Sequence, residues 1–397
     1  MHKQKWWCAL LALATITTQA ENNPIIDLLN HRDYDRDAIL RQAPSDRSPT
    51  DVQEKSQPPI DTDNSIFLPL RAPSIGKDIK PTALALVLPT KAGKLAGRAA
   101  NSFHRGCLHG IQKSQQAVEI DLYATDGTAE SVYANYAAAV RNAAQFVVGP
   151  MLKSGVKELL NRQPQALVPT LLLQPSAGEG YYVMTLDAGQ EATDLAHLLH
   201  AQGITNVRVI EQPGQRGSQQ RKAFEQAWIA ASGKISGRFL VRDPARDWQR
   251  LFDDLKELPD EKGGLVLFAA GNGDFARKAR KFVPQQYSVF AVSINNNQAS
   301  GSLLSEGLRF MEMPWFFTLP NEHTIFDAPQ TRTLPIIRQR FFALGIDACL
   351  AVLNSPLWDE NWLMNGISGN WQLKNGTFSR AGKLAFYRGG RLRELTP

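Results

Sequence analysis

The sequence predicts an α/β protein with two lobes, in which parallel sheets are flanked by helices. Two observations predict this class. Short apolar runs rich in β-branched residues alternate with segments of helical periodicity, which is typical of strand–helix–strand units with a parallel sheet. The alternation runs to about residue 188 and then starts again, so a second unit of similar build follows the first. We expect a cleft between the lobes, at the carboxyl edges of the two sheets.

The run from Gln145 to Leu160 shows this unit most clearly. Its strand, 146–148, is apolar throughout, as in a strand buried on both faces of a parallel sheet. Gly149-Pro150 ends the strand, because proline cannot donate a ladder hydrogen bond and glycine permits a sharp exit. Ser154 is then expected to cap an amphipathic helix. A loop that leads from such a strand into a helix N-terminus is where open α/β sheets bind ligands.

The other elements follow from the same two periodicities. In the first lobe we expect strands at 83–88, 118–123 and 166–173, and helices at 98–115 and 129–142. A further extended segment is expected at 181–186. In the second lobe we expect strands at 207–210, 234–241, 264–270 and 288–292, and helices at 190–202, 219–231, 245–258 and 275–282. Beyond them, we expect 307–317 to be extended, 334–354 to be helical and 367–393 to form β hairpins.

Three features of the C-terminal part carry more specific expectations. The aromatic run 314–317 is expected to cross between the lobes and to pack there. Asp347 is expected to brace the helix that returns to the first lobe. The hairpin 371–380, with Asn375-Gly376 at its turn, is expected to close the edge of the second lobe. The predicted boundaries are a signal peptide at 1–20, a tether at 21–79, a first lobe at 80–188 and 318–356, and a second lobe at 189–317 and 357–397.

The N-terminal residues have the pattern of a secretory signal. Lys3 and Lys5 precede an apolar run, and Thr18-Gln19-Ala20 offers a cleavage site. We expect cleavage after Ala20 and a periplasmic protein without a transmembrane segment, because the apolar run is too short to serve well as a retained membrane anchor. Cys8 precedes most of the apolar run and no lipobox is seen, so we expect no acylation. Residues 21–79 are rich in Asp, Arg, Pro, Ser and Gln without periodicity, which predicts a disordered tether.

Charge and cysteine content narrow the function classes. The chain has 44 Lys and Arg against 38 Asp and Glu, and this net charge of +6 is too weak to indicate a nucleic-acid partner. Cys107 and Cys349 lie in helices assigned to the first lobe, so they are candidates for spatial neighbours. Two such cysteines do not build a disulfide scaffold. We expect free buried thiols, with a disulfide between them as the alternative.

Motifs for catalysis and metal binding are weak. Ser154 and Lys157 have the Ser-x-x-Lys spacing of penicillin-interacting enzymes, but the companion elements are missing. His197 and His200 lie three apart on one helix without a third ligand at a matching position. Gly271-Asn272-Gly273 follows a strand but lacks the full glycine pattern of a phosphate loop. We therefore expect no enzyme activity, no metal and no cofactor.

A ring of polar and small residues at the strand ends is the better candidate for a site. Small hydroxyls, free backbone N–H groups and a few charges are what a cleft needs to hold a small polar ligand such as a zwitterion or a sugar. The competing interpretation is that these are only turn residues. The candidate cleft residues are Thr90, Lys91, Thr125, Asp126, Gly149, Met151, Lys153, Ser154, Ser176, Arg216, Ser218, Asn272 and Asp274.

Several segments also resemble a known family. The alternation over 82–354 resembles the type I periplasmic-binding-protein fold. The segments FVVGPMLK at 146–153, GLRFMEMPW at 307–315, ALGIDA at 343–348 and the tail from Gly366 to Arg380 are similar to the LppC-type penicillin-binding protein activators, the LpoA family. The resemblance covers roughly residue 80 to the C-terminus.

This resemblance implies a non-enzymatic protein of the Gram-negative cell envelope. Its members are outer-membrane-associated activators that bind a bifunctional, class A penicillin-binding protein and regulate peptidoglycan synthesis. The alternative is a periplasmic solute-binding protein that delivers an amino acid or a similar small polar ligand to an ABC importer. The two functions differ in the surface that must bind tightly, which is the outer surface in the first and the cleft in the second.

Overall fold

A computed structural model describes most of the chain beyond the predicted tether. The described residues are 82–176, 178–257, 265–293, 305–317, 331, 333–355, 358–359, 362–389 and 391–395. The predicted signal peptide and tether therefore lie outside the described residues, as does Ala177.

The first sheet has the strand order β11-β12-β13-β5-β4-β3-β1-β2. Its strands are β1 (Thr82–Leu88), β2 (Val118–Ala124), β3 (Phe146–Val148), β4 (Gln165–Leu172), β5 (Glu179–Met184), β11 (Leu363–Asn365), β12 (Asn370–Lys374) and β13 (Thr377–Ala381). Its helices are α2 (Lys94–Ser114), α3 (Ala129–Arg141), α4 (Lys153–Arg162) and α10 (Ile336–Leu353). Strands β1 to β5 pair in parallel, and β11 to β13 extend the sheet beyond β5.

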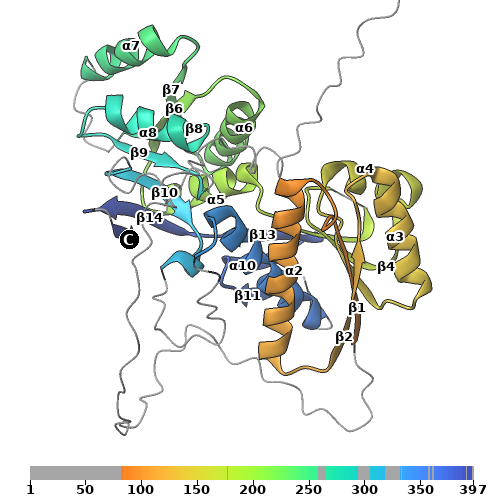
Figure 1. Ribbon diagram of the computed structural model, residues 1–397. Helices are drawn as coiled ribbons and strands as arrows, with labels where there is room; N and C mark the ends of the chain where they lie inside the picture. The colour runs from red at the N-terminus through yellow and green to blue at the C-terminus, as the bar shows by residue number, and fades with distance from the viewer. Residues whose placement is uncertain are drawn as a thin grey trace, which may run out of the picture.

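The second sheet has the order β15-β14-β10-β9-β8-β6-β7. Its strands are β6 (Asn206–Glu211), β7 (Lys234–Leu240), β8 (Val266–Ala270), β9 (Ser288–Ala291), β10 (Leu308–Glu312), β14 (Lys383–Arg388) and β15 (Arg391–Glu394). Its helices are α5 (Ala188–Ala201), α6 (Gln215–Ala230), α7 (Pro244–Lys256) and α8 (Gly273–Phe282). The 3-10 helix η2 (Pro314–Phe316) follows β10. The predicted α/β fold with two lobes is confirmed (Figure 1).

Helices cover both faces of each sheet because successive side chains of a buried strand point to opposite faces. Leu84 and Leu86 of β1 pack with α2 and α10, whereas Ala85 and Val87 pack with α3 and α4. In the second sheet, α5 and α6 cover one face and α7 and α8 cover the other. A strand that is covered by helices on both faces is apolar in every position, and this pattern in the sequence indicates the layered fold.

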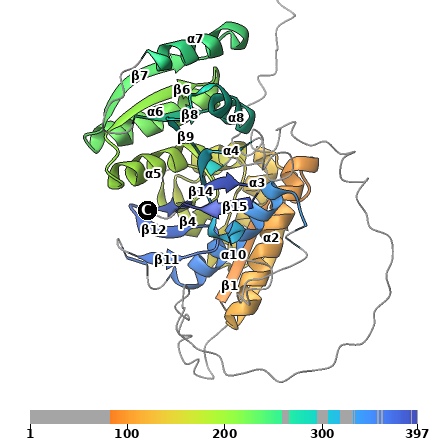
Figure 2. The same cartoon turned by 90° about the vertical axis from the view of Figure 1, so that its left-hand side faces the viewer.

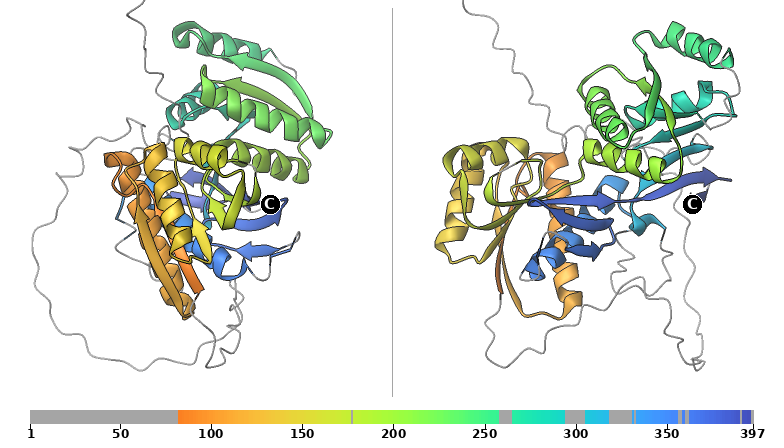
Figure 3. Two further views of the ribbon diagram at one scale, coloured as in Figure 1. Left: turned by 90° about the vertical axis from the view of Figure 1, so that its right-hand side faces the viewer. Right: turned by 180° about the vertical axis from the view of Figure 1, so that it is seen from behind.

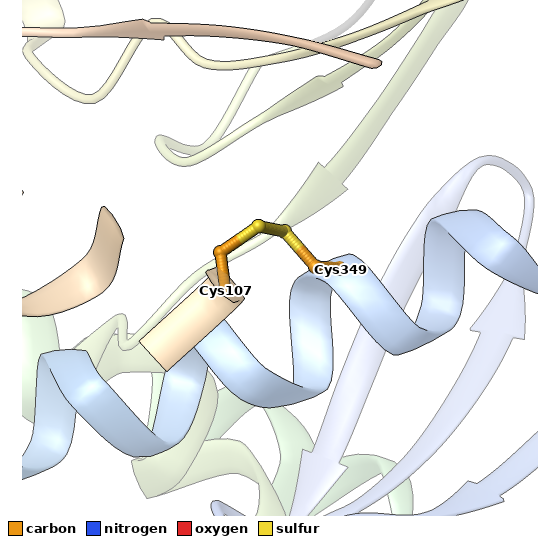
Figure 4. The surroundings of a disulfide bond; sticks show 2 residues. All are labelled: Cys107 and Cys349. Carbon is orange, nitrogen blue, oxygen red and sulfur yellow. A yellow bond between two sulfur atoms is a disulfide. The ribbon is translucent and has the colours of Figure 1, made fainter. Parts of the chain in front are cut away.

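Helices α2 and α10 are packed unusually closely. A Cβ atom added at Gly106 would lie 2.0 Å from the carbonyl oxygen of Phe342, and one at Gly345 would lie 2.1 Å from that of Phe103. Cys107 of α2 and Cys349 of α10 form a disulfide between the two helices, with a Cα–Cα distance of 5.3 Å (Figure 4). The two cysteines are neighbours, but the expectation of free thiols was wrong.

Two helices begin about one turn away from the predicted position, and the predicted cap of a third is wrong. Helices α2 and α6 begin at Lys94 and Gln215, about one turn earlier than expected. Glycines in their first turns suggested loops, but they permit close packing: a Cβ at Gly217 would lie 2.1 Å from the carbonyl oxygen of Gln212. Ser154 is not a cap either, because Leu152 is the N-cap residue of α4 and Ser154 lies inside the first turn.

The hairpin predicted for the second lobe belongs to the first sheet. Strands β12 and β13 pair with each other around the expected Asn375-Gly376 turn, and β13 pairs in parallel with β5. Trp371 and Phe378 explain this placement, because both are buried in the core beneath α2 and α10. Only Gly382 separates β13 from β14, which pairs with β10 of the second sheet, so the chain passes directly between the lobes (Figure 3).

Candidate functional site

Most of the candidate cleft residues gather at one edge of the first sheet. They follow strands that are neighbours in the order β4-β3-β1-β2, so the loops after these strands lie together. These residues are Thr90 and Lys91 after β1, Thr125 and Asp126 after β2, Gly149 and Met151 after β3, Lys153 and Ser154 at the start of α4, and Ser176 after β4. Backbone hydrogen bonds join the loops: the Lys91 N–H donates to the Thr125 carbonyl at 3.0 Å.

The candidate residues of the first lobe differ in their burial. Thr125, Gly149 and Met151 are buried, so their side-chain positions do not face solvent. Met151 belongs to the core, and its carbonyl accepts a hydrogen bond from the Gln174 amide at 3.0 Å. The Thr125 hydroxyl is buried without a hydrogen-bond partner among the described residues. These three residues shape the loops; any ligand contact falls to their more exposed neighbours.

Asp126 and the two lysines are the exposed charged members of the first-lobe set. The Asp126 carboxylate accepts hydrogen bonds from the backbone N–H of Thr128 at 2.9 Å and from its hydroxyl at 2.7 Å. These bonds to Thr128 lower the pKa of Asp126, because they stabilise the ionised form. Lys91, on the loop after β1, and Lys153, at the start of α4, belong to the same edge, which gives it mixed charge.

The second-lobe candidates form a separate group on α6 and α8. Arg216 and Ser218 lie in the first turn of α6 rather than in a loop. Asn272 is the N-cap residue of α8, and its side chain accepts a hydrogen bond from the Phe275 N–H at 2.9 Å. Asp274 pairs with Arg277 at 2.5 Å. Capping and pairing within the helix account for the last two without a ligand.

A surface hollow lies along α6 beside this group. It has a volume of about 460 Å³ and is open to solvent. It is lined by Gln215, Ser218, Gln219, Lys222, Ala223 and Gln226. Ser218 is the one predicted site residue among them.

A buried polar network, not predicted from the sequence, lies at the junction of the lobes. Its centre is Glu191, in the first turn of α5, which accepts a hydrogen bond from the Ser293 N–H at 2.9 Å and another from the Ser293 hydroxyl. Arg380 of β13 donates to the same carboxylate, and its other terminal nitrogen donates to the Ser368 carbonyl at 2.8 Å. Burial lowers the pKa of Arg380 to about 10.

Arg340 of α10 continues this network into the second sheet. Its guanidinium donates to the Ser293 carbonyl and to the Glu312 carboxylate of β10 at 3.0 Å. Arg340 is 4 % exposed and Glu312 is fully buried. Breaking a buried pair of this kind leaves a charge without compensation, which costs several kcal/mol.

Asp347 anchors the other end, between α10 and the hairpin. Its carboxylate accepts hydrogen bonds from the N–H groups of Ile367 at 3.0 Å and Ser368 at 2.8 Å, from the Ser368 hydroxyl, and from the Trp371 indole at 3.0 Å. Burial raises the pKa of Asp347 to about 6, and the donors oppose this rise. The predicted bracing role of Asp347 is confirmed.

Apolar contacts accompany the network. Trp315 of η2 is 2 % exposed and packs with Phe342, Ile346 and Ile367, so the expected packing of the aromatic run near the lobe junction is confirmed for this residue. The charged members could have been suspected from sequence, because Arg340 and Asp347 lie in a helix whose residues from Phe341 to Leu353 are apolar apart from Asp347. Their partners could not.

Among the described residues, no cluster of three or more His, Cys, Asp or Glu side chains is placed to hold a metal ion. None of the helices described here combines the length and the apolar character needed to cross a membrane.

Comparison with known proteins gives a family match and a curated relative. Residues 76–273, about half of the chain, match the family described as LppC putative lipoprotein. The penicillin-binding protein activator LpoA of Haemophilus ducreyi is 23% identical over 279 residues, which cover 65% of this chain and 46% of that protein. The chain thus spans about half the length of this relative.

Solved structures agree on the fold. Full-length LpoA from Haemophilus influenzae is 17% identical with a TM-score of 0.67, covering 80% of this chain and 59% of that one. The C-domain of the same protein, described as a regulator of PBP1A, is 16% identical with a TM-score of 0.67, covering 79% of this chain and 99% of the domain. A putative branched-chain amino acid ABC transporter chain from Chromobacterium violaceum is 24% identical with a TM-score of 0.62, covering 76% and 99%.

These matches bear on the fold and on the family. The type I periplasmic-binding-protein-like fold predicted from the sequence is confirmed. Family match, curated relative and structural neighbours together confirm that this chain resembles the LppC/LpoA-type penicillin-binding protein activators.

Proposed function

We propose that this chain is a non-enzymatic periplasmic regulator of peptidoglycan synthesis that acts by binding a class A penicillin-binding protein. The similarity to the LppC/LpoA family carries the proposal. The described fold covers 99% of the LpoA C-domain, a regulator of PBP1A, and residues 76–273 match the LppC family. The disulfide between Cys107 and Cys349 supports an oxidising compartment such as the periplasm.

The junction network also favours this function over solute capture. A receptor that closes on a solute moves its lobes about the connecting segments. Here Glu191, Arg340 and Arg380 bridge those segments with buried charged hydrogen bonds, and a change in lobe angle would strain them. A fixed arrangement suits a protein that presents its outer surface to a partner.

Binding to a purified class A penicillin-binding protein tests the proposal. We expect the exported chain to bind the synthase and to raise its cross-linking activity, and binding to weaken as salt screens the charged surface. The cleft variant Ser176→Ala should bind equally well, because the partner contacts the outer surface. Absence of synthase binding would contradict the proposal.

The second candidate is an amino-acid receptor, favoured by the polar loops that gather at the edge of the first sheet. Calorimetry with amino acids would then show micromolar affinity, about −8 kcal/mol. Ser176→Ala and Lys91→Ala would weaken that binding. Amino-acid affinity without synthase binding would establish this function in place of the first.

A further inference from the structure

Strand β15 is an open edge of the second sheet. It pairs with β14 on one side, from Ala385 opposite Glu394 to Arg388 opposite Arg391. No described strand lies on its other side, since β15 ends the strand order. Figure 2 shows the β14–β15 ribbon near the C-terminus. Within the described residues, the outer backbone groups of β15 thus have no partner strand, and such groups can pair with an added strand.

The pairing shows which groups point outward. The Leu395 N–H donates to the Leu384 carbonyl at 2.7 Å. In an antiparallel ladder, hydrogen-bonded pairs alternate with pairs that do not exchange bonds. Arg393 and Arg391 therefore direct their N–H and C=O groups to β14. Leu392 and Glu394 direct theirs to the open side.

Four arginines lie on one face of this ribbon. Arg309 of β10, Phe386 of β14 and Arg393 of β15 stand in one cross-strand row. Arg388 and Arg391 form the next row, and side chains two residues apart on a strand share a face. Arg388, Arg391 and Arg393 are exposed, and no carboxylate of the described residues pairs with them. We call Arg309, Arg388, Arg391 and Arg393 the arginine face.

The acidic groups nearby do not neutralise this face. Glu394 points to the opposite face, where it pairs with Lys383 at 2.8 Å. Glu306 accepts a hydrogen bond from the Gly389 N–H at 3.3 Å, so it contributes to the turn of the ribbon. The face therefore keeps an excess of positive charge.

Charged edges also serve to prevent unwanted strand pairing. Here Arg388 and Arg391 stand directly opposite each other, and like charges in this position destabilise a sheet. An acidic occupant would remove the repulsion, which is why the pattern favours a binding edge.

We propose that the β15 edge takes an extended, acidic segment of a partner protein as an added strand. The backbone of the segment would pair with Leu392 and Glu394, and its alternate acidic side chains would lie beside the arginine face. If the partner is the synthase, the inference rests on the proposed function. The binding of an acidic strand by the β15 edge does not depend on that function.

A designed peptide tests the edge without the synthase. The probe is a blocked peptide of about eight residues with alternating Glu and Val, the length of an ordinary strand. We expect it to bind the full chain, and hydrogen exchange to slow at the Leu392 and Glu394 amides. Alternating Lys and Val, or N-methylation of alternate residues of the probe, should abolish binding. No binding on the order of 1 mM would overturn the proposal.

Two variants with the same change of charge localise the site. Arg391→Glu with Arg393→Glu should weaken peptide binding by about tenfold or more. Arg98→Glu with Arg105→Glu, on the exposed side of α2, should leave it unchanged. Arg391→Gln with Arg393→Gln guards against misfolding and should show an intermediate loss. Equal binding by all variants would contradict the proposal.

Two further measurements separate the alternatives. Vesicles containing phosphatidylglycerol should not compete with the peptide. If they bind through Arg391 and Arg393 while the peptide does not bind, the face recognises lipid and the proposal is wrong. If the peptide binds but the synthase does not, the edge proposal stands and the proposed function fails. If the synthase binds equally well to the arginine variants and the peptide does not bind, the proposed function stands and the edge proposal fails.

Discussion

Glu191 of α5 and Arg380 of β13 form a buried ion pair that joins the two lobes. Their side chains are 6% and 3% exposed, and the residues are 189 positions apart in the sequence. The same Glu191 carboxylate accepts hydrogen bonds from Ser293, beyond β9. Elements of both sheets thus meet at one carboxylate. This contact makes the lobe arrangement dependent on charge as well as on apolar packing.

Removing one partner of this pair should be costly. Arg380→Met leaves the Glu191 carboxylate buried and unpaired, so we expect the free energy of unfolding to fall by about 3–5 kcal/mol. Glu191→Gln with Arg380→Met should lose less than Arg380→Met alone, because the neutral amide can still accept the Ser293 N–H bond. Urea unfolding measures both. A larger loss in the double variant would show that the pair is not the source of the effect.

The disulfide should stabilise the crossing of α2 and α10. It closes a loop between positions 242 residues apart, and long loops confine the unfolded chain most. We expect Cys107→Ala with Cys349→Ala to lower the free energy of unfolding by about 2–4 kcal/mol. Reductant should destabilise the wild type to the same extent. If reductant also destabilises the double variant, the effect does not come from this bond.

Replacement of the Asp347 carboxylate by an amide should destabilise the protein. In Asp347→Asn, the NH₂ group would face one or more of the donors from Ile367, Ser368 and Trp371, and two donors cannot bond to each other. We expect a loss of about 3–5 kcal/mol in unfolding free energy. Trp371 fluorescence should also shift, because its indole would lose its acceptor. An unchanged stability would contradict the role of Asp347 as the brace of the hairpin.

The strands were predictable because burial leaves a mark on composition. Phe146–Val148 is apolar in every position, and the structure places β3 at the same residues. Helix starts were less predictable where glycine serves packing. Gly97 and Gly217 suggested loops, whereas both lie in first turns where a side chain would meet a neighbouring carbonyl. Local sequence does not distinguish these two uses of glycine.

Contacts between residues that are distant in the sequence could not be predicted from it. The Asn375-Gly376 turn predicted the hairpin 371–380, but not the sheet to which it belongs. The positions of Cys107 and Cys349 could not supply their 5.3 Å Cα separation. In the first lobe, the strand ends located the loops after β1, β2 and β3, but not the burial of Thr125 and Met151 in them. Which residues meet a ligand stays a prediction.

Asp194 of α5 should make the stability fall as pH rises. Its Oδ1 accepts a hydrogen bond from the Gln190 amide at 3.0 Å, while Oδ2 is buried without a partner among the described residues. Burial raises the pKa of Asp194 to about 7. In the unfolded chain the pKa is about 3.9, so between these values the folded state binds more protons. The contribution of Asp194 to stability is therefore present below about pH 4 and is lost as pH rises to 7.

Asp194→Asn tests this, because the amide stays neutral at every pH. Against the wild type, we expect a gain in unfolding free energy on the order of 1–3 kcal/mol at pH 8 and little change at pH 4. Asp126→Asn is the matched control: the pKa of that exposed carboxyl is lowered, so its replacement should not stabilise the protein at pH 8. Urea titrations at the two pH values measure the difference. A gain for Asp194→Asn that is equal at pH 4 and pH 8 would show that ionisation of a buried carboxyl is not its cause.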